Sequence, residues 1–293
     1  MSENKINREY KDRLFVFIFG RNENRKWTLN LYNAVNGSSY TDADAIEINT
    51  IEDSVYMGMR NDVSFLFHSE FNLYEQQSTY NPNMPLRKLM YLGKLYDKYR
   101  IQNELDIYGS KLIEIPVPRL ITFYNGKDDV DDRILRLSDA FPKDADPSLF
   151  DVDVRVKMIN VNLGHNKQLL DACKPLFEYS WLIDEIRKNL KELGKEDAVD
   201  KAILDMPRDY ELYSFLLAHR AEVKDMFITE YDEAEHMRLL KRDAKEEGRE
   251  DERIRNLAEM IKNGGTDDDL KRFLNASDEE ITKAKKSLEI LVQ

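Results

Sequence analysis

Three oxygen-bearing side chains in the first third of the chain have the spacing of a divalent-metal site. Asp62 begins an alternation of polar and bulky residues, Glu75 lies thirteen positions further on, and Gln77 follows two positions later. Side chains two residues apart on a strand point to the same face, so Glu75 and Gln77 are predicted to share one. If the two segments pair as a hairpin, Asp62 joins them. Two carboxylates and an amide offer the hard oxygen ligands that Mg²⁺ prefers.

The predicted hairpin has strands over residues 61–67 and 73–78 and a polar turn over residues 68–72. Glu70 falls in this turn and is expected to be exposed rather than catalytic. The alternation also suits a strand face in contact with solvent, and an acidic chain contains carboxylate pairs at this distance by chance. Both interpretations of the hairpin stay open on spacing alone.

The segment after the hairpin is predicted to be a helix that begins after a proline-rich turn at residues 81–85. Its apolar stripe is predicted to contain Leu86, Leu89, Met90, Leu92, Leu95 and Tyr96. Another face gathers residues at steps of four, three and four, namely Arg87, Tyr91, Lys94 and Lys98.

The remaining elements predict a mixed α/β fold. The apolar run over residues 11–20 suits a short helix or a strand, and a helix over residues 27–35 ends at Asn36-Gly37. Strands are expected over residues 113–124 and 152–158, with helices after residue 166. A mixed sheet flanked by helices accommodates this order of elements.

Residues 229–293 are predicted to form a charged, all-helical C-terminal appendage to a domain over residues 1–228. Thr266 with Asp269, and Ser277 with Glu280, have the capping-box pattern and open two short helices. A DNA-binding helix-turn-helix is disfavoured, because the second helix begins with acidic residues that repel phosphate. A packing or homo-oligomerisation module is the expected role of the appendage.

Composition excludes several classes of protein and site. The 293-residue chain has a net charge of -12, which argues against nonspecific coating of nucleic acid but not against a nuclease. Cys173 is the only cysteine and the four histidines are dispersed, so neither a disulfide framework nor a thiol or imidazole metal site is expected. No phosphate-binding loop or dinucleotide-binding turn occurs. No apolar run reaches the roughly 20 residues of a membrane span, and the N-terminus lacks an apolar signal core, so we expect a cytoplasmic protein.

Several segments, in order along residues 8–240, resemble the PD-(D/E)XK nuclease family transposases of the Rpn recombination-promoting type. The segments are Lys11-Asp12, Phe19-Gly20, Leu31 to Ala34, Asn61 to Leu66, Glu75 to Arg87, Phe123 to Gly126, Leu135 to Phe141 and Gly164 to Lys167. The resemblance implies a restriction-endonuclease-like core. It also implies that Asp62 and Glu75 bind Mg²⁺, or alternatively Mn²⁺, and that Gln77 stands where many relatives have Lys.

On this resemblance the expected function is a Mg²⁺-dependent DNA endonuclease associated with recombination or mobile elements. Gln77 can orient a water, but an amide supplies neither positive charge nor a proton acceptor, so more of this role falls to the metal or to a nearby cation. The candidates for phosphate contact are Arg87, Lys94 and Lys98, which equally suit a solvated helix face. An acidic residue that such nucleases often have in their first helix is replaced here by Asn30. The alternative function is a catalytically silent protein that keeps this fold to bind DNA or a protein partner.

Overall fold

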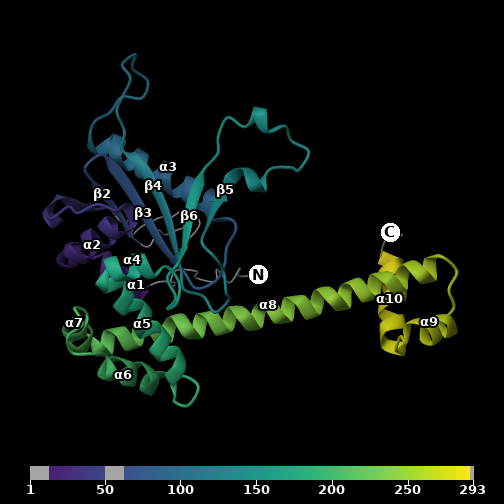
Figure 1. Ribbon diagram of the computed structural model, residues 1–293. Helices are drawn as coiled ribbons and strands as arrows, with labels where there is room; N and C mark the ends of the chain where they lie inside the picture. The colour runs from purple at the N-terminus through teal and green to yellow at the C-terminus, as the bar shows by residue number, and fades with distance from the viewer. Residues whose placement is uncertain (1–12, 50–62, 291–293) are drawn as a thin grey trace. The chain divides into compact units, whose positions relative to one another are not determined.

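The computed structural model of the protein describes residues 13–49 and 63–290 (Figure 1). Contacts divide the chain into two compact units, Met1–Glu230 and Tyr231–Gln293. The long helix α8, Arg220–Lys262, contains the boundary between them. In the described residues no helix is long and apolar enough to cross a membrane.

The first unit is built on a six-stranded mixed sheet with the order β1-β2-β3-β4-β6-β5. The pairs β3 with β4 and β4 with β6 are parallel, and the other neighbours are antiparallel. The prediction of a mixed sheet flanked by helices is therefore confirmed. The strands are β1 Ile46–Ile48, β2 Val63–Phe67, β3 Glu70–Gln77, β4 Val117–Tyr124, β5 Arg133–Arg136 and β6 Arg155–Asn160.

Helices cover both faces of this sheet (Figure 1). The helices α1, Arg13–Phe19, and α2, Arg25–Asn36, lie on one face, where Phe15 packs on Phe123 and Tyr32 on Phe65. Gly37 ends α2 in the left-handed conformation with φ 64°, as the Asn-Gly pair predicts. Helix α3, Met84–Gln102, covers the opposite face, where Leu73 of β3 belongs to its apolar cluster. The apolar run over residues 11–20 thus forms a helix where the structure describes it.

The hairpin of β2 and β3 has a tighter turn than predicted. His68 and Ser69 alone connect the strands, and His68 has a φ of 53°. The predicted turn over residues 68–72 is wrong at its second half, because Phe71 is buried and pairs with Leu66 in the ladder. Glu70 is consequently the first residue of β3, partly buried, and accepts a hydrogen bond from the Tyr32 hydroxyl at 2.8 Å.

The buried face of α3 is rotated from the predicted stripe. Leu86 and Met90 are 49% and 37% exposed, so their assignment to the apolar stripe is wrong. The buried side chains recur at helical spacing and are Met84, Pro85, Lys88, Tyr91, Leu92 and Leu95. Helical spacing therefore holds, but it carries a lysine and a tyrosine into the interior in place of two apolar residues.

Further helices complete each unit. The first unit contains α4 Lys167–Ala172, α5 Lys174–Asn189, α6 Lys195–Asp205, α7 Tyr213–Ala218 and the start of α8. The second contains the end of α8, α9 Asp267–Leu274 and α10 Asp278–Ile290, which bury a cluster around Leu257, Leu270 and Ile281. Both predicted capping boxes form.

Candidate active site

Glu75 lies in the centre of the sheet, on the face that α3 covers. It occupies β3 opposite Thr122 of the parallel strand β4, and it is 0% exposed. Leu73 lies two positions earlier in β3 and packs under α3, so the alternation of the strand directs Glu75 to the same face. A carboxylate buried this deeply requires charged or hydrogen-bonding partners.

The partners of the Glu75 carboxylate come from β3 and from the first turn of α3. Gln77 Nε2 donates to Glu75 Oε1 at 3.0 Å, which places both side chains on one face as the alternation predicts. Arg87 Nη2 lies 2.6 Å from the same oxygen, and Lys88 Nζ lies 3.2 Å from Oε2. Oε2 is buried and accepts no hydrogen bond from the residues that the structure describes, so its contact with Lys88 is an ion pair. The carboxylate is thus held between two cations.

Lys88 is the residue of this site that the sequence interpretation missed. Its side chain is 0% exposed, and its ammonium donates to the main-chain oxygen of Leu73 at 3.0 Å as well as facing Glu75. Burying an ammonium is costly unless it is paired, so Lys88 and Glu75 depend on each other. The signal in the sequence was the helical spacing from Met84 through Lys88 to Leu92 and Leu95, which places Lys88 on the buried stripe.

Arg87, a predicted phosphate contact, forms an ion pair with Glu75. Its side chain is 33% exposed, so one of its sides reaches solvent. The guanidinium also contacts the Tyr91 hydroxyl at 3.3 Å and the Met84 sulfur at 3.6 Å. Arg87 therefore connects the buried carboxylate to the surface of α3.

The two other predicted phosphate contacts lie further along α3. Lys94 is partly buried, and its ammonium is enclosed without a hydrogen-bond partner in the described part of the chain. Lys98 is exposed. No ion pair among the described residues joins either lysine to Glu75. The helical face predicted from Arg87, Tyr91, Lys94 and Lys98 hence changes from buried to exposed along its length.

The donor set around Glu75 fits a hard cation in one respect and opposes it in another. The Glu75 oxygen Oε2, which accepts no hydrogen bond in the described part of the chain, and the adjacent Gln77 amide are ligands of the kind that Mg²⁺ takes. Arg87 and Lys88 already compensate the charge of the carboxylate. The described residues contain no cluster of three or more His, Cys, Asp or Glu side chains suited to a metal. Asp62 lies outside the described residues, and the last described pair of the β2–β3 ladder joins Val63 to Tyr74.

Asn30 lies in α2, and α2 packs against the face of the sheet opposite Glu75. The residue expected to replace an acidic one therefore lies in a different layer of the fold from Glu75. The described contacts of Glu75 come from β3 and α3 alone.

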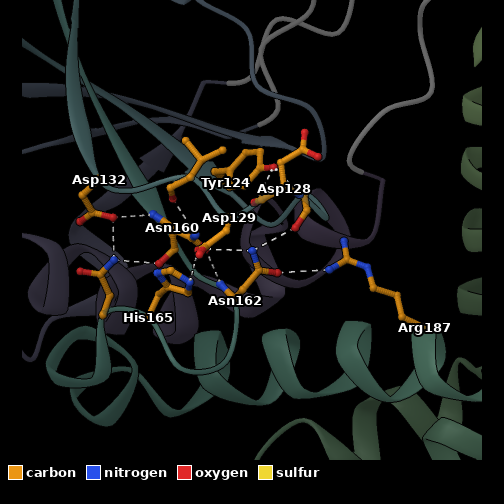
Figure 2. Close-up of polar contacts among 11 residues, drawn as sticks. Tyr124, Asp128, Asp129, Asp132, Asn160, Asn162, His165 and Arg187 are labelled. Atoms are coloured by element: carbon orange, nitrogen blue, oxygen red, sulfur yellow. Dashed lines mark hydrogen bonds and ion pairs between the residues drawn. The ribbon is translucent and has the colours of Figure 1, made fainter.

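A second polar cluster lies beyond the carboxyl ends of β4 and β6 (Figure 2). Asp132 accepts hydrogen bonds from the Asn160 amide and from Asn166 Nδ2, both at 2.7 Å. His165 Nε2 lies 3.3 Å from Asp129. These groups pair with one another and join the loop after β4 to the loop after β6, so the cluster supports the sheet edge rather than presenting unpaired ligands.

Arg187 of α5 extends this second cluster toward the sheet. It donates to Asn162 Oδ1 at 3.2 Å and to the main-chain oxygen of Asn125. Burial lowers the pKa of Arg187. On the far face of β3 from Glu75, Gln76 also donates to Asn125 Oδ1. Arg187 and Asn125 thereby fix the end of β4 next to the strand that carries Glu75 and Gln77.

The structure brings together Glu75, Gln77 and Arg87 of the predicted site and adds Lys88 to them. Lys94 and Lys98 lie along the same helix. The chain matches no family model, and comparisons with curated proteins and with solved structures also found no match.

Proposed function

We propose that the protein is a Mg²⁺-dependent DNA endonuclease with a restriction-endonuclease-like core, centred on Asp62, Glu75 and Gln77. The observation that carries the proposal is the buried Glu75 carboxylate, which has the Gln77 amide beside it and two cations within 3.2 Å. A carboxylate can hold a metal that activates water, and cations on the covering helix can stabilise the negative charge that develops in phosphodiester hydrolysis. The resemblance of residues 8–240 to Rpn-type nucleases supports the same function.

Each residue of the site has a role in this proposal. Asp62 and Glu75 hold the Mg²⁺, which when bound supplies Lewis-acid polarisation of a phosphodiester oxygen and acidifies a water. Gln77 orients the attacking water by hydrogen bonding. Lys88 holds the Glu75 carboxylate in place, because its buried ammonium pairs with Oε2 and is fixed by the Leu73 carbonyl. Arg87 supplies positive charge that Gln77 lacks.

Cleavage of supercoiled plasmid tests the proposal. In Mg²⁺ the native protein is expected to convert supercoiled plasmid to nicked or linear DNA, and Asp62→Asn and Glu75→Gln are expected to abolish this. Glu70→Gln is the matched control, because Glu70 lies on the same strand but contacts Tyr32 on the other face. No nicking by the native chain, or equal nicking by Glu75→Gln and Glu70→Gln, contradicts the proposal. Strand joining, which transposition requires, is a further step beyond cleavage.

A second candidate function is a catalytically silent protein that retains the fold to bind DNA or a protein. One observation favours it: Arg87 and Lys88 already neutralise Glu75 without a metal. Calorimetric titration with Mn²⁺ separates the two functions. Binding that depends on Asp62 and Glu75 supports the nuclease, whereas DNA binding that persists without any such metal binding supports the silent protein.

The unit Tyr231–Gln293 is proposed to be a packing module that joins copies of the chain. It buries its own apolar cluster, and it keeps Phe273 67% exposed. Light scattering of the full chain and of a chain ending at residue 230 tests this proposal. An equal oligomeric state in both excludes the module from assembly.

A further inference from the structure

Arg87 occupies the carboxylate on which the proposed metal must bind. Its Nη2 lies 2.6 Å from Glu75 Oε1, which is the length of a strong charge-assisted contact. A Mg²⁺ ion takes carboxylate oxygens at about 2.1 Å. A dication on Oε1 therefore lies within about 5 Å of Nη2, a distance at which salt screens the repulsion between the two charges only weakly.

Two cations face Glu75, but only one of them has a route away. Lys88 is 0% exposed and donates to the Leu73 carbonyl inside the fold. Arg87 is 33% exposed and lies in the first turn of α3, next to solvent. Its departure from Glu75 uncovers the carboxylate without placing an unpaired charge in the interior.

The guanidinium of Arg87 has an alternative partner in the proposed substrate. The planar fork of an arginine matches the oxygens of a phosphate as well as those of a carboxylate. A DNA phosphate that reaches the exposed side of Arg87 thus competes with Glu75 for the same donor. Lysine offers only a point charge for either partner.

We propose that Arg87 is an exchangeable gate on the metal site: it holds Glu75 in the free protein and transfers to a DNA phosphate when substrate binds. This inference rests on the proposed nuclease function of the same site. It makes metal and DNA binding mutually dependent, because the phosphate removes the cation that repels the metal. By linkage, DNA raises the affinity for metal by the same factor as metal raises the affinity for DNA.

Calorimetric titration of the full chain with Mn²⁺, with and without a short DNA duplex, tests the gate. Without DNA, Arg87→Gln is expected to bind Mn²⁺ about tenfold more tightly than the native protein, because a like charge has been removed. The native protein gains a similar factor when DNA is added, and Arg87→Gln gains none. Arg87→Lys keeps the charge and is expected to bind Mn²⁺ as weakly as the native protein.

Arg100 provides the matched control for this experiment. It lies on the same helix and pairs with Asp97 at 2.8 Å, so Arg100→Gln also removes an arginine from a carboxylate. Its Mn²⁺ affinity is expected to equal that of the native protein.

In metal-free buffer, Arg87→Gln is also expected to bind the duplex more weakly than the native protein. The salt dependence of its DNA binding is expected to be lower by about one phosphate contact.

The result that overturns the gate is equal Mn²⁺ affinity of the native protein and Arg87→Gln, including no binding by either. Plasmid cleavage separates this failure from failure of the proposed function. If Arg87→Gln binds Mn²⁺ more tightly and DNA raises the Mn²⁺ affinity of the native protein only, but the native chain cuts no DNA, the gate stands and the nuclease proposal fails. If the native chain cuts DNA and the affinities are equal, the nuclease proposal stands and the gate fails.

Discussion

Replacement of Lys88 by Met is expected to destabilise the first unit by about 3 kcal/mol. The substitution removes an ammonium that is 0% exposed and faces a carboxylate that is also buried. Removing one partner of a buried ion pair costs about 3–5 kcal/mol, because the other charge stays behind. Met retains most of the apolar stem, and Glu75 keeps Arg87 and Gln77 as partners, so the lower end of this range applies.

A double-mutant cycle measures the interaction free energy between Lys88 and Glu75. Glu75→Gln and Lys88→Met together are expected to cost about 2 kcal/mol less than the sum of the single variants, since each leaves an uncompensated group that the other removes. Urea unfolding followed by tryptophan fluorescence measures these free energies. Trp27 and Trp181 are the two tryptophans of the chain, and both lie in Met1–Glu230.

The matched control for this cycle is Lys98→Met, which changes an exposed lysine of the same helix and is expected to shift stability by less than about 0.5 kcal/mol. The inference that Lys88 and Glu75 stabilise each other in the interior is refuted by either of two results. One is a fall of less than about 1 kcal/mol in the free energy of unfolding of Lys88→Met, and the other is strict additivity of the two substitutions in the cycle.

Three further predictions concern other parts of the chain. Arg220 lowers the pKa of Asp200 to about 2, and Asp200→Asn is expected to cost about 1 kcal/mol at neutral pH in urea unfolding; an unchanged midpoint contradicts this. Arg253 lowers the pKa of Glu280 from 4.5 to about 2. The ionised Glu280 therefore stabilises the helical unit above pH 4.5, and this stabilisation is lost as the pH falls toward 2. Carboxyl NMR titration should show this depression, and it should vanish in Arg253→Gln. Burial raises the pKa of Cys173 to about 12, so a thiol reagent at pH 8 should label this residue only after unfolding. Rapid labelling of the folded chain contradicts the burial of Cys173.

The elements with a strong periodic signal could be predicted from the sequence. Alternation located the β2–β3 hairpin, and Asn36-Gly37 located the end of α2. Thr266 and Ser277 located the starts of α9 and α10 through their capping boxes. In each case a local physical rule decides the structure, so no knowledge of distant contacts was needed.

Elements that depend on distant contacts could not be predicted. The three-residue strand β1, Ile46–Ile48, exists because it pairs with β2, and β5, Arg133–Arg136, because it pairs with β6. Nothing in so short a stretch distinguishes a strand from a loop. Lys88 was missed for a related reason: a charged residue on an apolar stripe is interpreted as exposed until its carboxylate partner on another element is known.

Of the candidate site, the shared face of Glu75 and Gln77 followed from the strand period alone. The ion pair between Arg87 and Glu75 did not, because it joins a strand to a helix whose rotation the sequence placed wrongly. The contribution of Asp62 stays a prediction, because the residue lies outside the part of the chain that the structure describes.

The proposed function requires Asp62 and Glu75 to hold the same metal ion, and metal-directed cleavage of the protein is a direct test of this requirement. With a DNA duplex present, Fe²⁺ in place of Mg²⁺ reduces added hydrogen peroxide to hydroxyl radicals that cut the backbone beside the bound ion, and ascorbate regenerates the Fe²⁺. Cuts are expected next to residues 62 and 75, and they should disappear in Glu75→Gln and on addition of excess Mg²⁺. Cuts confined to the acidic segment at residues 128–132, or no specific cuts, contradict it.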